Sequence, residues 1–142
     1  MLYIQTKDFT KQLDLIEWFA SSADCDVICW FFPESKFHEI CDLETSKPDL
    51  IEGEPVTTYG GGLKPIKTKR VKLDLQLLRK FRTDEKNIRK NVDSIVVYRK
   101  NENKWLACVI EHEGMCMVQD DNIETVLNNA NFHTNKTAPS WW

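Results

Sequence analysis

Three apolar segments joined by short polar turns, between residues 94 and 119, constrain the fold of this chain more than any other feature. Their β-branched and aromatic content favours strands. Turns of two to four residues connect antiparallel neighbours, because a parallel connection needs a long crossover. The sequence therefore predicts an antiparallel meander over 94–119. Its segments are SIVVYR at 94–99, KWLACVIEH at 104–112 and MCMVQ at 115–119.

A further strand is predicted over residues 27–32, where the sequence VICWFF is continuously apolar and Pro33 ends the run. A short strand with no polar alternation is typical of a position buried on both faces. We therefore expect residues 27–32 to form a central strand of the sheet. Residues 2–4 also have strand propensity, and a strand is expected to end near Leu73.

Helices are predicted where an N-cap residue precedes apolar residues at helical spacing. Thr6 or Asp8 is expected to cap one such segment, over 8–21, and Asp74 begins another that runs to Phe81, with a further helical turn to Lys90. Ser35 is expected to cap a short helix to Cys41. A final helix is expected over 122–131, with four residues directed inward: Ile123, Val126, Leu127 and Ala130.

Helices interspersed with strands indicate an α+β fold, and a length of 142 residues suits one domain. We predict a single α+β domain over 1–142. Its sheet is antiparallel or mixed, and its helices lie mainly on one face. Residues 45–55 hold two prolines and a glycine among acidic residues, which favours a surface loop.

The formal net charge is only −3, but the charges are unevenly distributed. Residues 1–59 hold 4 basic and 12 acidic residues, residues 60–104 hold 14 and 5, and residues 105–142 hold 1 and 5. The local net charges are thus −8, +9 and −4. Either the acidic and basic segments fold against one another, or the protein has one basic and one acidic face for partners.

Five cysteines, an odd number, and the absence of a signal peptide pattern favour free thiols in a reducing compartment. The most apolar window, residues 27–32, is much shorter than a membrane span. We therefore expect a soluble cytoplasmic protein that has no membrane partner.

The sequence YGGGLKPIKTKRVK at 59–72 places three glycines before a basic stretch. It is not a phosphate-binding P-loop, because Pro65 stands where such a loop requires a helix. A flexible hairpin tip is the favoured interpretation. The alternative function is nucleic-acid or nucleotide-phosphate binding through the basic segment 64–90. Its candidate phosphate-binding residues are Lys64, Lys67, Lys69 and Arg70.

Residues 25–41 contain four residues of types that bind zinc. The spacing lacks the paired knuckles of structural zinc sites, and Cys29 falls inside the predicted buried strand. We predict no metal site and no cofactor. The four residues are Cys25, Cys29, His38 and Cys41.

No spacing in the chain matches a catalytic signature, so no catalytic residue is assigned. His112 lies between Glu111 and Glu113 and is interpreted as a solvated turn histidine. An enzyme whose site is assembled from scattered residues remains an alternative. A cleft that joins His38, His112 or His133 to a cysteine or a carboxylate would support it.

Two features of the last third of the chain indicate binding of another protein. Trp141 and Trp142 could dock on their own domain or in a partner's groove, since tryptophan is a frequent interface anchor. The second feature is an acidic set that could mimic nucleic acid and cover the basic site of a nuclease. That acidic face consists of Glu111, Glu113, Asp120, Asp121 and Glu124.

We therefore expect a small binding protein that inhibits another protein, possible targets being a toxin or a nuclease, by occluding its surface. Bacterial immunity proteins and phage-encoded inhibitors have this general character, a likeness of class and not of sequence. Nucleic acid is the less favoured partner.

Overall fold

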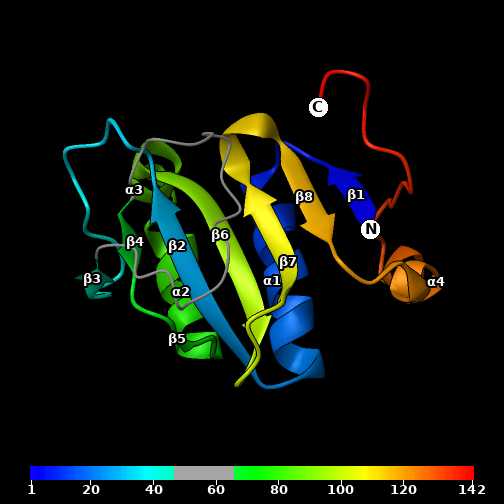
Figure 1. Ribbon diagram of the computed structural model, residues 1–142, viewed down its shortest axis with the longest axis horizontal. Helices are drawn as coiled ribbons and strands as arrows, with labels where there is room; N and C mark the ends of the chain where they lie inside the picture. The colour runs from blue at the N-terminus through cyan, green and yellow to red at the C-terminus, as the bar shows by residue number, and fades with distance from the viewer. Residues whose placement is uncertain (47–65) are drawn as a thin grey trace.

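An antiparallel sheet with helices packed behind it forms the framework of the protein (Figure 1). The computed structural model describes residues 1–46 and 66–142. The strand order is β1-β8-β7-β6-β2-β4-β3, and β5 also pairs with β2. The strands are β1 (Leu2–Gln5), β2 (Cys25–Phe31), β3 (Thr45–Ser46), β4 (Lys67–Thr68), β5 (Val71–Lys72), β6 (Val92–Arg99), β7 (Trp105–Ile110) and β8 (Met115–Val118).

The predicted meander and the predicted central strand are both confirmed. Strands β6, β7 and β8 are consecutive antiparallel neighbours, with Val96 opposite Cys108 and Val109 opposite Cys116. Strand β2 lies in the interior of the sheet, between β6 on one side and β4 and β5 on the other. Every pairing between the described strands is antiparallel.

The first two helices, α1 and α2, begin at predicted capping residues. Asp8 Oδ1 accepts a hydrogen bond of 2.9 Å from the backbone N–H of Thr10, and Asp74 Oδ1 accepts one of 2.8 Å from Leu77. Such caps satisfy backbone donors that have no partner within the helix. The helices are α1 (Phe9–Ser22), α2 (Leu75–Thr83), α3 (Glu85–Asn91) and α4 (Glu124–Asn129), with 3-10 turns η1 (Glu111–Glu113) and η2 (Asp121–Ile123).

Side chains of the sheet alternate between two buried clusters. The first lies under α1, α2 and α3, and includes Leu13, Phe81 and Ile88 from these helices together with Val97 and Val109 from the sheet. Figure 1 shows these three helices behind the same face of the sheet. The second cluster lies on the other face and consists of Ile28, Trp30, Val96, Tyr98, Cys108, Ile110, Met115 and Met117. The apolar residues of β2 are therefore buried on both faces, as a central strand requires.

Two helix predictions were wrong. Residues 35–41 contain no helix, and the segment ends in a tight turn at Cys41 and Asp42, which have φ values of 52° and 59°. The hydrogen bond of 2.9 Å from Leu43 N–H to Ile40 C=O closes that turn. The final helix is shorter than predicted, since η2 and α4 occupy 121–129, and Val126 is 52% exposed instead of directed inward.

Several predictions fall on residues 47–65 and lie outside the described residues. They concern the loop over 47–55, the strand propensity at 56–59, the glycine tip and Lys64. Thr45 and Ser46, at the start of the predicted loop, belong to β3. Within the described part of the chain, no helix is long and apolar enough to span a membrane.

Gly114 joins η1 to β8 in the left-handed region, with φ of 63°. Replacement with alanine is expected to lower the free energy of unfolding by about 1–2 kcal/mol, because residues that carry a Cβ are strained in this region. The added Cβ would also lie 2.7 Å from Lys7 Cγ. Urea unfolding measures the loss, and a smaller loss in a Lys7→Ala background would separate the contact from the backbone strain. Equal stability of the Gly114→Ala and wild-type proteins would contradict the prediction.

Candidate functional site

Residues 130–142, called the tail below, leave α4 and run along the free edge of the sheet. Asn131 turns the chain with φ of 68°, and Asn128 Oδ1 accepts hydrogen bonds from the N–H and the hydroxyl of Thr134, at 3.1 and 3.0 Å. Asn135 then exchanges two backbone hydrogen bonds of 2.8 Å with Tyr3 of β1. The tail is thus held against the edge strand through the backbone N–H and C=O groups of Tyr3. Without the tail, these groups of the edge strand would be unpaired.

The tail ends in two tryptophans that contact each other and remain exposed. Their ring centroids lie 6.1 Å apart with the planes at 84°, an edge-to-face pair. A turn in which Trp142 N–H donates to Pro139 C=O at 3.0 Å fixes the backbone next to them. Trp141 is 56% exposed and Trp142 is 43% exposed. Large apolar side chains presented in this way are the features that protein interfaces use as anchors.

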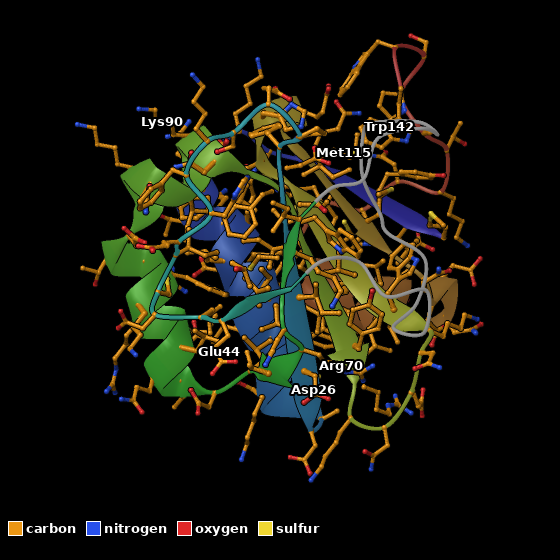
Figure 2. All side chains as sticks on the ribbon, turned by 60° about the vertical axis from the view of Figure 1, so that its left-hand side comes forward. Asp26, Glu44, Arg70, Lys90, Met115 and Trp142 are labelled. Carbon is orange, nitrogen blue, oxygen red and sulfur yellow. The ribbon has the colours of Figure 1, made fainter. Side chains whose placement is uncertain are left out.

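The tryptophan pair lies at the end of the sheet where η1 connects β7 to β8. Figure 2 shows Trp142 close to Met115, the first residue of β8. Figure 1 places the end of the chain beside the same connection. The structure therefore brings the predicted aromatic residues to the end of the sheet that also carries Glu111 and Glu113.

The two acidic residues of η1 differ in their environment. Arg89 Nε donates to Glu111 Oε1 at 2.7 Å, and the Glu111 side chain is only 10% exposed. Glu113 is more open, with Oε1 at 3.6 Å from His112 Nδ1. Glu111 is thus engaged with the fold, whereas Glu113 has a side chain available to a partner.

The other three acidic residues lie at the opposite end of β8, around the start of α4. Asp120 Oδ1 accepts hydrogen bonds of 2.9 Å from the backbone N–H and the side-chain amide of Asn122. Asp121 lies beside the amino group of Met1, and Glu124 Oε2 is 3.0 Å from Lys136 Nζ. This carboxylate raises the pKa of Lys136 and links α4 to the tail. The structure thus divides the five predicted acidic residues into two groups.

The basic residues of the alternative phosphate site interact within the chain. Lys67 is buried on β4, opposite Trp30 of β2. Lys69 Nζ lies 2.7 Å from Glu44 Oε2. Lys64 lies outside the described residues, so the structure does not place the set as a whole.

Arg70 has the most contacts of that set. Its Nε donates to Asp26 Oδ2 at 2.9 Å and its Nη2 donates to the carbonyl of Arg99 at 2.8 Å. The guanidinium also lies over the ring of Tyr98, with Cζ 4.8 Å from the centroid. Figure 2 shows Arg70 and Asp26 side by side. These contacts hold the β4–β5 segment on β2.

Sequence reasoning missed the contact of His112 with a buried aspartate, Asp93. A bulge in β6, where Phe31 pairs with Val92 and Trp30 with Ser94, leaves Asp93 as the extra residue. Asp93 is buried, and its Oδ1 lies 2.9 Å from His112 Nε2. His112 lies in the exposed turn η1, as interpreted from the sequence, but its ring is also held by Asp93, which the sequence did not indicate. An aspartate inside a strand was the available signal.

Asp93 orients the His112 ring, as carboxylates do for catalytic imidazoles. The ring also packs edge-on against Phe32, with centroids 5.0 Å apart. The ring thus contacts two carboxylates, those of Asp93 and Glu113, and the phenyl ring of Phe32. This arrangement fixes the turn that carries Glu113, and it supplies an oriented imidazole.

A cleft of about 570 Å³ brings together His38, Cys41 and Asp84, the kind of juxtaposition that the alternative of an assembled enzyme site requires. Cys41 Sγ lies 3.8 Å from Asp84 Oδ2. Burial and then the Asp84 carboxylate raise the pKa of Cys41 to about 12, which keeps the thiol protonated. Because the thiolate is the nucleophile, this cysteine is poorly suited to covalent catalysis. No group of three or more metal-binding side chains occurs within residues 1–46 and 66–142.

Comparison with known proteins gives no relative: no family model, curated protein or solved structure matches this chain.

Proposed function

We propose that this protein binds another protein and acts by occluding part of its surface, with Trp141 and Trp142 as the anchor. The observation that carries the proposal is the exposure of two tryptophans, in edge-to-face contact, at the end of a tail fastened to β1. Fully burying large aromatic side chains is worth several kcal/mol, so the pair represents unused binding free energy. The fixed tail reduces the entropy that ordering on binding would cost.

Charge around the anchor supports a basic partner surface. Glu113 lies at the same end of the sheet as Trp142, and its carboxylate is partly exposed. Acidic residues beside an apolar anchor increase the association rate with a positively charged partner and disfavour an acidic one. A toxin or nuclease with a basic groove is the class of target that fits, and inhibition in the manner of an immunity protein or phage inhibitor follows.

The five free cysteines support action in a reducing compartment such as the cytoplasm.

The double variant Trp141→Ala/Trp142→Ala is expected to reduce partner affinity by about 100-fold or more, since hot-spot residues contribute about 2 kcal/mol or more each. Tagged wild-type and variant proteins are compared by quantitative capture from the native host. Binding of the purified partner is then measured by calorimetry. Stoichiometric loss of the partner's activity on addition of the wild-type protein would establish occlusion.

Val126→Ala is the matched control, because Val126 is an exposed apolar residue on α4 away from the tryptophan pair. It is expected to keep wild-type affinity. Circular dichroism verifies that each variant is folded. A partner retained equally by the double variant and the control would exclude the tryptophan pair as the anchor.

A further inference from the structure

We infer that α2 and α3 carry a second binding surface, a cationic stripe that contacts the phosphate backbone of double-stranded nucleic acid. The stripe consists of Arg79, Lys86 and Lys90, all of which are exposed. It is distinct from the residues Lys64, Lys67, Lys69 and Arg70 considered from the sequence. It also goes beyond the proposed function, which depends on the tail.

The three cations follow from helix geometry. Lys86 and Lys90 are one turn apart on α3, so their side chains share a face and their attachment points differ by about 6 Å along the axis. Arg79 lies on α2, seven residues before Lys86, and only Asp84 separates the two helices. Phe81 of α2 and Ile88 of α3 are likewise seven residues apart and are both buried, so Arg79 and Lys86, two residues before them, lie on corresponding outward sides of the two helices. Figure 2 shows nitrogen-tipped side chains projecting into solvent around Lys90.

Neighbouring basic residues are neutralised, whereas the stripe is not. Arg82 Nη2 contacts Asp14 Oδ1 at 2.8 Å and Glu17 Oε2 at 2.9 Å. Arg89 contacts Glu85 at 3.5 Å and Glu111 at 2.7 Å.

For Arg79, Lys86 and Lys90, by contrast, no carboxylate among the described residues lies within 4.0 Å. Like charges one turn apart disfavour a helix by a few tenths of a kcal/mol, so an anion along the stripe would relieve repulsion.

The chemistry of the stripe favours duplex nucleic acid over other polyanions. The apolar residues Leu77, Leu78 and Phe81 are buried under the sheet, so α2 has no continuous apolar face to insert into a membrane. No exposed side chain of α2 or α3 is aromatic, so bases of a single strand have no stacking platform there. Lysine is depleted in protein interfaces. Lysine and arginine on a rigid helix are the usual contacts to a phosphate backbone.

The stripe and the tryptophan pair are separate surfaces. Figure 2 shows Lys90 and Trp142 on opposite sides of the molecule, and Figure 1 places α3 and the end of the chain on opposite sides as well. The two surfaces could therefore be occupied together, and each can be removed by mutation without altering the other.

Fluorescence anisotropy with a labelled duplex of mixed sequence tests the inference. Three phosphate contacts predict that log K falls with log salt at a slope of about −3, and Lys86→Glu/Lys90→Glu is expected to weaken binding about ten-fold or more and bring the slope near −1. Lys86→Gln/Lys90→Gln, which removes the charges without reversing them, is expected to lie between the two. Thermal unfolding of both variants verifies that α3 is intact.

Lys100→Glu/Lys104→Glu is the matched control, because it makes the same change in net charge at exposed positions near the β6–β7 turn. It is expected to keep most of the duplex affinity. Equal losses in both charge-reversal variants would overturn the inference, since net charge alone would then explain binding. So would absence of duplex binding by the wild-type protein at low salt, or tighter binding to a single strand or to anionic vesicles.

Discussion

Replacement of Arg70 with alanine is expected to lower the free energy of unfolding by about 2–3 kcal/mol. The side chains of Arg70 and Asp26 are only 15% and 19% exposed, so the variant would leave the Asp26 carboxylate without its partner in a poorly hydrated position. Breaking a fully buried pair costs about 3–5 kcal/mol, and partial exposure reduces this figure. The variant also loses the hydrogen bond to the Arg99 carbonyl and the contact with the Tyr98 ring.

Urea unfolding monitored by tryptophan fluorescence measures this loss, and two further variants interpret it. Arg70→Lys keeps the charge but not the planar fork, so its stability is expected to lie between wild type and alanine. Lys69→Ala removes the neighbouring solvent-exposed pair with Glu44 and is expected to change the unfolding midpoint little. If Arg70→Ala were no less stable than Lys69→Ala, Arg70 would not hold β4 and β5 on β2, and a phosphate-binding role for it would regain support.

The framework was predictable from the sequence because local patterns determine it. Because only two to four polar residues separate their apolar runs, strands β6, β7 and β8 are expected to pair as antiparallel neighbours. Asp8 and Asp74 were recognised as caps because each precedes apolar residues at helical spacing. No helix follows Ser35, although its hydroxyl accepts a hydrogen bond from Phe37 N–H as a cap would; the same hydroxyl donates to Asn91 Oδ1 of α3, which is 56 positions away in sequence.

The candidate sites were predictable only in part, because charge partners are distant in sequence. Ion pairs join residues of the acidic first segment to the basic middle segment, as in Arg70 with Asp26 and Arg82 with Asp14. This confirms that the acidic and basic segments fold against one another. It also explains why net charge by segment could not identify free cations. The free cations of α2 and α3 can be told from the paired ones only when the ion pairs of the folded protein are known. The contact between Asp93 and His112 likewise depends on the β6 bulge, which the sequence does not indicate.

Alkaline solution is expected to unfold this protein through its buried thiols. Burial raises the pKa of Cys29 and Cys108 far above the usual value, and raises that of Cys116 to about 12. An unfolded cysteine has a pKa of about 8.5. Above that pH the unfolded chain holds fewer protons than the folded protein, so the free energy of unfolding falls as pH rises. The contribution of the buried thiols to stability is complete only below the pKa of the unfolded cysteine. Each thiol lowers the free energy of unfolding by about 1.4 kcal/mol per pH unit, so three thiols lower it by about 4 kcal/mol per pH unit.

Over about two pH units this loss is comparable to the whole stability of a typical domain, about 5–15 kcal/mol, so unfolding is expected near pH 10–11. The free energy of unfolding in urea, measured under reducing conditions from about pH 8 to about pH 10.5, gives the slope. Cys108→Ala/Cys116→Ala is expected to reduce the slope by about 3 kcal/mol per pH unit, whatever its effect on stability at neutral pH. Lysine and tyrosine titrations are common to both proteins and cancel in this comparison. Equal slopes in the wild-type and variant proteins would show that these thiols are hydrated in the folded state. That result would contradict the complete burial of Cys108 on β7 and Cys116 on β8.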